Sequence, residues 1–176
     1  IAFGKGPGSF TGLRIAISVA QGLSLATNAR LYGISSLAAL AWQGMKQMAE
    51  SSNGNTAGLQ VLAMMNAHMG EVFYGAYHSS DNGLEEVIED RLTRPESVDI
   101  SKLEASNWIG MGDGFQFLTE MPDDVSSLIS INEETCPMAE SMMDLAIRAW
   151  DNGLFTAAEL QQPVYLRDTV AWKKLA

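Results

Sequence analysis

Short strand-like runs alternate along this chain with longer segments of helical periodicity. The runs have the length of strands, and they lie at Ile1–Phe3, Leu31–Ile34, Leu59–Met65, Glu71–His78, Leu84–Leu92, Trp108–Met111 and Leu128–Ile131. Helices are expected between them, at Ser9–Thr27, Ser35–Glu50, Pro95–Glu104 and Pro137–Trp150. Strands that alternate with helices indicate an α/β fold.

Polar segments suggest how the chain is divided. The segment Ser51–Asn55 contains only Ser, Asn and Gly, and it predicts a linker between two lobes. A turn is expected at Asp81–Gly83, and Pro163–Arg167 is expected to be extended. Because Ile1 lies inside an apolar run, we expect that further residues precede it and complete the first lobe.

The first predicted helix is apolar on more than one face. One stripe consists of Leu13, Ile17, Ala20 and Leu23, and another consists of Ile15, Val19, Gly22 and Ala26. The polar stripe between them is narrow and consists of Arg14, Ser18 and Gln21. Such a helix must be covered on two sides, either by the rest of this chain or by a second subunit.

The second predicted helix repeats this pattern. One face consists of Leu37, Leu40, Ala41, Gly44 and Met48, and another consists of Ala38, Trp42, Met45 and Ala49. The positions left for water are Ala39, Gln43, Lys46 and Glu50. Small residues on these faces would permit close helix-to-helix approach, so the same two explanations remain open.

Composition and charge restrict the classes of function. The 176 residues are 47% apolar and carry a formal net charge of −10, with eleven scattered Lys and Arg. A strongly acidic chain is a poor nucleic-acid binder, because phosphate backbones require clustered cations. The single Cys136 excludes a disulfide within the chain and fits a reducing cytoplasm. No apolar segment is long enough to predict a membrane span.

The glycine-rich run Gly4–Arg14 (GKGPGSFTGLR) admits two interpretations. Backbone N–H groups at Gly6, Gly8 and Ser9 could bind an anion at the start of a helix. However, Lys5 precedes the glycines, so the run does not match the phosphate loop that ends in Gly-Lys-Ser/Thr. A structural turn that begins the helix, with a hydroxyl of Ser9 or Thr11 as its cap, is the favoured interpretation.

The other candidate chemistry is sparse. His68 and His78 lack the spacing of a zinc site, and no nucleophile motif accompanies them, so both are interpreted as surface residues. Cys136 is interpreted as a packing or helix-start residue. The acidic strip of Glu85, Glu86, Glu89 and Asp90 is interpreted as a solvated strand face. We therefore expect no catalytic residue, metal or cofactor in this chain.

Several segments together resemble the TsaB family, also called YeaZ. The first is GKGPGSFTGLRIAISVAQGLS, which begins at Gly4. Others follow in order: Asn66–Tyr74 (NAHMGEVFY), GMGDGFQ from Gly110, and Pro163–Lys174 (PVYLRDTVAWKK). The resemblance extends over the whole given chain.

The resemblance implies a two-lobed, actin-like and ribonuclease H-like ATPase fold whose first lobe lacks its N-terminal part. Its lobes would be residues 1–56, with the interface helices, and 57–162, followed by a C-terminal segment at 163–176. Members of the family are expected to act in threonylcarbamoyladenosine modification of tRNA. They are expected to be non-catalytic, cytoplasmic partners of the transferase TsaD and the ATPase TsaE, to form homodimers in isolation, and to meet tRNA only through the complex.

The resemblance also assigns an interface to the helices Ser9–Thr27 and Ser35–Glu50. On the first helix the expected contact residues are Arg14, Ser18, Gln21, Gly22 and Leu25. On the second helix they are Ala38, Ala41, Trp42 and Met45. The residues of the signature loop are Gly4, Gly6, Pro7, Gly8, Ser9, Thr11 and Gly12.

Two departures and two alternatives accompany this assignment. The family's usual DARMGE segment is replaced here by NAHMGE, with Asn66 and His68, so no role is transferred to these positions. The resemblance also implies an acidic residue after the family's opening strand, in a region that this sequence does not include. One alternative function is a nucleotide hydrolase or a peptidase of the M22 type, which rests only on analogy of fold. The other is a module that only associates with itself.

Overall fold

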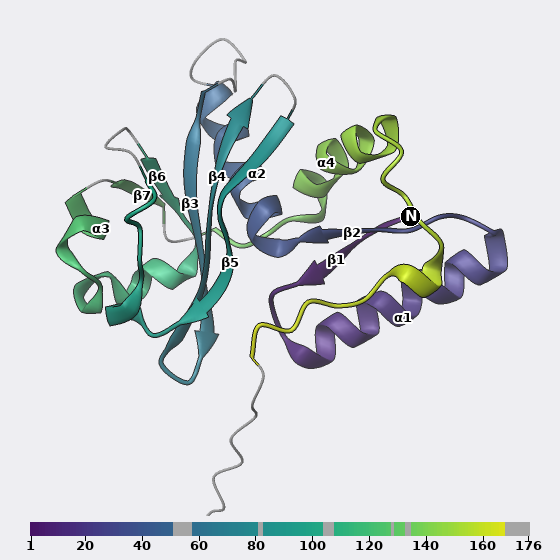
Figure 1. Ribbon diagram of the computed structural model, residues 1–176, viewed down its shortest axis with the longest axis horizontal. Helices are drawn as coiled ribbons and strands as arrows, with labels where there is room; N and C mark the ends of the chain where they lie inside the picture. The colour runs from purple at the N-terminus through teal and green to yellow at the C-terminus, as the bar shows by residue number, and fades with distance from the viewer. Residues whose placement is uncertain (51–57, 81–82, 104–107, 128, 133–134, 168–176) are drawn as a thin grey trace, which may run out of the picture.

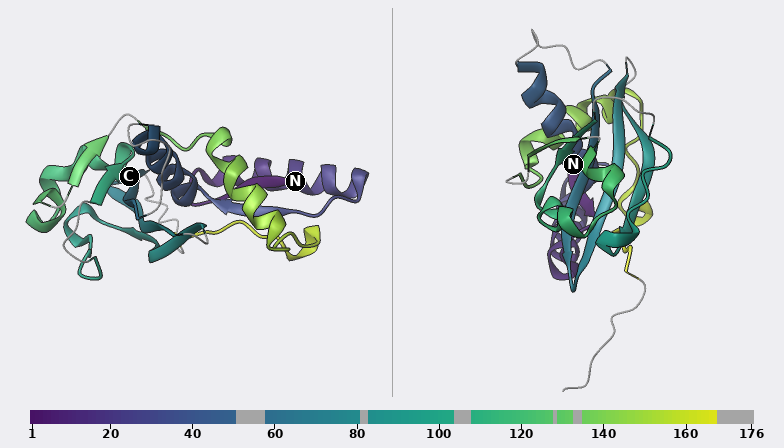
Figure 2. Two further views of the ribbon diagram at one scale, coloured as in Figure 1. Left: turned by 90° about the horizontal axis from the view of Figure 1, so that it is seen from above. Right: turned by 90° about the vertical axis from the view of Figure 1, so that its left-hand side faces the viewer.

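The computed structural model describes residues 1–50, 58–80, 83–103, 108–127, 129–132 and 135–167. They form two sheets that lie side by side along the long axis of the molecule (Figures 1 and 2). The small sheet pairs β1 (Ala2–Gly6) with β2 (Tyr32–Ser35) in parallel. The predicted strand at Ile1–Phe3 is therefore longer than expected and includes part of the glycine-rich run.

The large sheet has five strands in the order β5-β4-β3-β6-β7. Its antiparallel part consists of β3 (Gln60–His68), β4 (Glu71–Ser80) and β5 (Gly83–Thr93). Its parallel part adds β6 (Trp108–Met111) and β7 (Ile129–Asn132) to the edge at β3. The expected α/β class is confirmed, and each strand lies within a few residues of its predicted position.

Both faces of the large sheet are covered, which explains the continuous apolar run of β3. Val61 and Ala63 pack under α2 (Ser36–Glu50). Leu62 and Met64 point to the other face, where they meet the short helices η2 (Asp113–Glu120) and α3 (Asp123–Ser127). Successive side chains of a strand point to opposite faces, so a strand that is covered on both sides carries apolar residues at every position.

The remaining helices belong to the small sheet or join the two sheets. Helix α1 (Phe10–Thr27) packs on β1, where Phe3, Ile17, Ala20 and Leu31 form a small core. Helix α4 (Ala139–Asp151) contacts α2, β1, β2 and β5. A short turn, η3 (Ala158–Leu160), precedes the C-terminal segment 161–167. In space, α2 lies on the large sheet, while α4 returns to the small sheet. The lobe boundaries at residues 56 and 162 remain a prediction.

Two expectations about helices are corrected. Within the predicted helix Pro95–Glu104, the described residues up to 103 form only η1 (Pro95–Ser97). The Asp99 carboxylate accepts a bond from the Ser101 backbone N–H at 2.9 Å, which competes with a helical turn. The helices η2 and α3 were not predicted. The linker Ser51–Asn55 lies outside the described residues, as do two of the three residues of the turn expected at Asp81–Gly83.

Candidate docking surface

Helix α1 divides sharply into a buried face and an exposed face. The buried positions are Leu13, Ile17, Ala20 and Ser24. The most exposed apolar residues are Ile15, Val19 and Leu25, at 60%, 57% and 90%. With Thr11, Ser18, Gly22 and Ala26, which are also exposed, they cover one side of the helix at i, i+4, i+7 and i+11. We call this side the α1 face.

Leu23 differs from the other members of its apolar stripe. Leu13, Ile17 and Ala20 are buried, whereas Leu23 is 51% exposed and the neighbouring Ser24 is buried. The Ser24 hydroxyl donates to the carbonyl oxygen of Ala29 at 2.5 Å, so its polarity is satisfied at the end of the helix. The exposed Leu23 side chain enlarges the apolar area that α1 presents to its surroundings.

The signature loop is built as a strand-to-helix turn. Gly6 has a φ of +109°, and a Cβ atom there would lie 2.8 Å from the carbonyl oxygen of Val164. Ser9 caps α1, because its side chain accepts from the backbone N–H of Gly12 at 3.3 Å. Gly4 and Gly8 have open space where a side chain would be. Among these three loop glycines, close packing therefore requires only Gly6 to lack a side chain.

Two of the predicted contact residues are engaged by the chain's own C-terminal part. The Gln21 side-chain amide donates to the carbonyl oxygen of Ala158 at 3.3 Å. The Arg14 Nε atom donates to the hydroxyl of Tyr165 at 3.2 Å, and its guanidinium stacks on the ring of Phe10. Both residues therefore border the α1 face, while Ser18, Gly22 and Leu25 lie within it.

The predicted contact residues on α2 are placed differently. Ala41, Trp42 and Met45 are only 0%, 4% and 0% exposed, because the large sheet covers them. The Trp42 indole N–H donates to Asp144 of α4 at 3.0 Å. Ala38 is half-buried. The expectation that these side chains lie on a contact surface is corrected, since the second apolar face of α2 is covered by this chain. Ala39, which was assigned to water, is also buried.

Three of the segments quoted for the resemblance meet at the turn between β3 and β4. The backbone N–H of Asn66 donates to Asp113 at 2.8 Å, and the Asn66 side-chain oxygen accepts from the backbone N–H of His68 at 2.7 Å. Arg167 donates to Glu71 and to the carbonyl oxygen of Ala67. Hydrogen bonds with Asp113 and Arg167 thus hold the turn even though its sequence departs from DARMGE.

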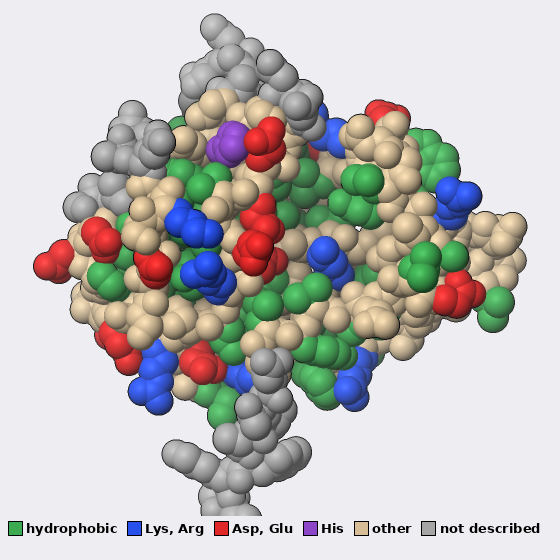
Figure 3. Space-filling view, in the orientation of Figure 1, with side chains coloured by type: hydrophobic (Ala, Val, Ile, Leu, Met, Phe, Trp, Pro, Cys, Tyr) green, Lys and Arg blue, Asp and Glu red, His purple; other side chains and the backbone are tan. Residues whose placement is uncertain are grey.

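The acidic strip on β5 is not a uniform solvated face. Glu85, Glu86 and Glu89 are exposed, and acidic side chains of this kind gather near the centre of the view in Figure 3. Asp90 is half-buried and accepts hydrogen bonds from the hydroxyls of Ser35, at 2.6 Å, and Tyr77. No local pattern signals this pairing, because the three residues are distant along the chain.

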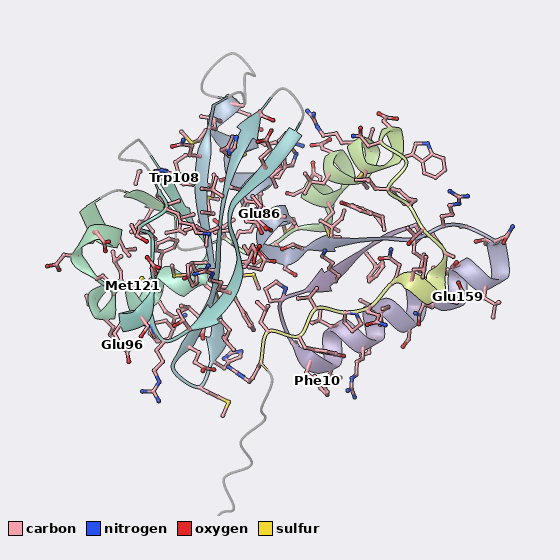
Figure 4. The ribbon with its side chains drawn as sticks, viewed as in Figure 1. Phe10, Glu86, Glu96, Trp108, Met121 and Glu159 are labelled. Carbon is pink, nitrogen blue, oxygen red and sulfur yellow. The ribbon has the colours of Figure 1, made fainter. Side chains whose placement is uncertain are left out.

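Burial controls the ionisation of this cluster. Burial raises the pKa of the Asp90 carboxyl above its usual range, against the opposing effect of hydrogen bonds from Ser35 and Tyr77. Burial also raises the pKa of Tyr77, and the nearby Asp90 charge adds to the rise. Glu86, which faces the small sheet in Figure 4, has a pKa raised by burial and by the charge of Asp90.

The described part of the chain carries neither a metal-binding cluster nor a membrane-spanning helix. No group of three or more His, Cys, Asp or Glu side chains there has a geometry that could hold a metal ion. Of the helices in that part, none combines the length and the apolar character needed to span a bilayer. His78 is paired with Glu85 at 3.2 Å, His68 is exposed on the β3–β4 turn, and Cys136 is exposed before α4.

Comparisons with known proteins agree with the geometry. A family model described as TsaD, tRNA N6-adenosine threonylcarbamoyltransferase, matches residues 1–174. The tRNA threonylcarbamoyladenosine biosynthesis protein TsaB of Escherichia coli is 37% identical over 99% of this chain and 73% of its own length. The Haemophilus influenzae protein of the same name is 30% identical over 99% and 72%.

Solved structures give the same result. YeaZ from Pseudomonas aeruginosa superposes with a TM-score of 0.81 at 35% identity, over 94% of this chain and 72% of that one. A second structure from that organism, described as similar to the peptidase YeaZ, has a TM-score of 0.80 at 34% identity, over 95% and 73%. From the motifs, the fold and these similarities, we conclude that the chain belongs to the TsaB (YeaZ) family, within the wider group that the TsaD model describes.

Proposed function

We propose that this chain is a non-catalytic subunit in the biosynthesis of threonylcarbamoyladenosine in tRNA, and that it docks on TsaD through the α1 face. The observation that carries the proposal is the exposed apolar side of α1, on which Ile15, Val19 and Leu25 are each more than half exposed. Isolated exposed apolar residues are ordinary, but a continuous helical face of them is typical of an interaction site.

The choice of TsaD as the partner follows from the family match. One family model, which carries the name TsaD, describes nearly all of this chain. Two related chains can pack equivalent helices against each other about an approximate two-fold axis, as subunits of symmetric dimers do. Helix α1 suits such packing, because Gly22 at the middle of its face leaves open space for a close helix-to-helix approach.

The same geometry admits self-association, with a second copy in place of TsaD. We propose that the homodimer uses the α1 face when TsaD is absent, so that the two states exclude one another. The net charge of −10 supports a role in which tRNA and TsaE are reached through the cytoplasmic complex. A peptidase or hydrolase is less well supported, because analogy of fold is its only support.

The test compares two substitutions on full-length protein. Ile15→Asp places a charge in the middle of the α1 face. Met138→Asp places one at a residue that is 51% exposed and lies before α4, so it is the matched control. A charge buried in an apolar contact should weaken TsaD binding at least thirtyfold, whereas the control should stay within twofold.

Three measurements read out this comparison. Calorimetric titration gives the affinity for TsaD, sedimentation gives the homodimer, and threonylcarbamoyladenosine formed on tRNA with TsaD and TsaE gives the function. We expect Ile15→Asp to impair all three without changing the thermal unfolding of the isolated chain. Unchanged TsaD affinity in Ile15→Asp would refute the docking surface, and full modification without this chain would refute the proposed role.

A further inference from the structure

Arg14 is held rigidly at the edge of the α1 face, although it is exposed. Its guanidinium carbon lies 3.7 Å from the centre of the Phe10 ring, and its Nε atom donates to the Tyr165 hydroxyl at 3.2 Å. The rings of Phe10 and Tyr165 are themselves 5.4 Å apart. Stacking and the Nε bond fix the plane of the guanidinium, which an exposed arginine would otherwise vary freely.

The tyrosine that holds Arg14 is itself fixed on both sides. On one side, the backbone N–H of Val164 donates to the carbonyl oxygen of Lys5 at 2.7 Å. On the other side, Arg167 is bound to Glu71 and to the carbonyl oxygen of Ala67. Figure 4 shows Phe10 at the start of α1, next to this C-terminal segment. The position of Arg14 therefore depends on contacts to both sheets.

The terminal amino groups of Arg14 are free among the described residues. Its hydrogen bond within the described residues uses Nε, and no carboxylate of the described chain lies within ion-pair distance of it. The two terminal nitrogens of a guanidinium form a planar fork that matches the two oxygens of a carboxylate. A shallow depression lies beside this fork, lined by Phe10, Thr11, Arg14, Ile15, Ser18 and Val19.

We propose that Arg14 is a specificity residue of the α1 face, and that its fixed guanidinium binds a carboxylate of an Asp or Glu side chain on the docked partner. This inference rests on the proposed function, because the partner is the protein that covers the α1 face. A carboxylate at this place would be sheltered by Phe10 and by the apolar side chains around Ile15. A wrong partner without an acid there would leave the guanidinium desolvated and unpaired.

An RNA phosphate is the competing ligand, and the surroundings of Arg14 disfavour it. Arg14 is the only Lys or Arg within α1, and the chain as a whole is strongly acidic. Binding to a phosphate backbone draws its strength from several cations acting together. A single bidentate contact at the border of an apolar face is instead typical of recognition between proteins.

The experiment measures the affinity of full-length protein for purified TsaD at low and at physiological salt. Arg14→Lys keeps the charge but loses the fork and the stacking, and we expect about tenfold weaker binding. Arg14→Gln also loses the charge, and we expect a larger loss with a weaker dependence on salt. Arg30→Gln changes an exposed arginine outside the α1 face and serves as the control, expected within twofold of the wild type.

The outcomes separate this inference from the proposed function. If Ile15→Asp abolishes TsaD binding but Arg14→Lys binds like the wild type, only the carboxylate assignment is overturned. If Arg14→Gln weakens binding of tRNA to the assembled complex and leaves TsaD affinity unchanged, a phosphate is the ligand and the assignment is again overturned. If the wild type does not bind TsaD, both are overturned. Restored binding of Arg14→Glu to TsaD in which one surface Asp or Glu is changed to Arg would identify the partner's acid.

Discussion

Asp90 lies in a sequence segment that looks fully solvated, but contacts with other segments leave it half-buried. It stands on β5 beside exposed glutamates, and it accepts hydrogen bonds from Ser35, which begins the connection into α2, and from Tyr77 on the neighbouring strand. The same Ser35 oxygen accepts from the backbone N–H groups of Leu37 and Ala38. One carboxylate thus ties the start of α2 to the large sheet.

The raised pKa of Asp90 predicts a specific pH dependence of stability. Between the ordinary carboxyl pKa of about 3.9 and the raised folded value, the folded protein keeps a proton that the unfolded chain has lost. Stability should therefore fall as pH rises through this window and stay level above it. Urea unfolding from pH 4 to pH 7 measures the unfolding free energies of wild type and Asp90→Asn. As pH rises, the wild type should lose stability relative to the variant.

Asp99 provides a control of opposite sign when the same measurement is extended below pH 4. Its pKa is lowered, chiefly by the hydrogen bond with Ser101, so its contribution to stability is present above the unfolded pKa and is lost in acid. Asp99→Asn should therefore remove a gain in stability on rising pH, whereas Asp90→Asn should remove a loss. Equal slopes in wild type and Asp90→Asn would show that Asp90 titrates as an ordinary surface carboxyl.

At the scale of the element, the caps at the two ends of α1 are important for its stability. Phe10 to Thr27 contains neither an acidic first turn nor a basic last turn, so its termini depend on other partners. The N-terminal cap is Ser9, and the C-terminal cap is Asn28 in the left-handed conformation, at a φ of 56°. Because one side of α1 is exposed, packing supports it less than it supports α2, and its caps matter correspondingly more.

We therefore expect Ser9→Ala to cost about 1 kcal/mol of unfolding free energy, because the Gly12 backbone N–H loses its acceptor. Thr11→Ala is the matched control, since Thr11 is also an exposed hydroxyl residue and lies within the first turn. Its effect should stay within about 0.5 kcal/mol. Chemical denaturation measures both. A larger loss of unfolding free energy in Thr11→Ala than in Ser9→Ala would show that Ser9 is not the residue that caps α1.

At the scale of the whole molecule, the C-terminal segment 161–167 connects the two sheets. It meets β1 through Val164, α1 through Tyr165 and the β3–β4 turn through Arg167. The side chains of Arg167 and Glu71 are 27% and 31% exposed, so water screens their ion pair only in part. This ion pair joins the C-terminal segment to β4 of the large sheet.

A double-mutant cycle should detect this link. We expect Arg167→Gln and Glu71→Gln each to destabilise the protein, with a coupling of about 1 kcal/mol between them. The double variant Arg167→Glu with Glu71→Arg reverses the ion pair and keeps its opposite charges. We expect it to recover only part of the lost stability, because Arg167 also donates to the Ala67 carbonyl. Strictly additive single effects in urea denaturation would show that the pair contributes nothing to holding the sheets together.

Individual residues show what the sequence pattern could not reveal about α1 and α2, and the contact role expected for α1 stays a prediction. Both helices carry apolar residues on two faces, and the pattern did not reveal what covers the second face. On α2, the large sheet and α4 bury Trp42 and Ala39. On α1, nothing in the described chain covers Ile15 or Leu25. The residues that turned out to be paired over long distances, Asp90 and Arg167, carried no local signal.

The amino-acid sequence by itself determined the order of the strands and of the longer helices, the α/β class, a hydroxyl cap at the start of α1 and the membership of a family. These features depend on short-range periodicity, hydroxyl capping and contiguous motifs, all of which act within a few residues. Only the tertiary structure decided which apolar face stays exposed, which acid is buried and where Arg14 is held. Those outcomes depend on contacts between segments far apart in the chain, as between Arg14 and Tyr165, and no local pattern contains them.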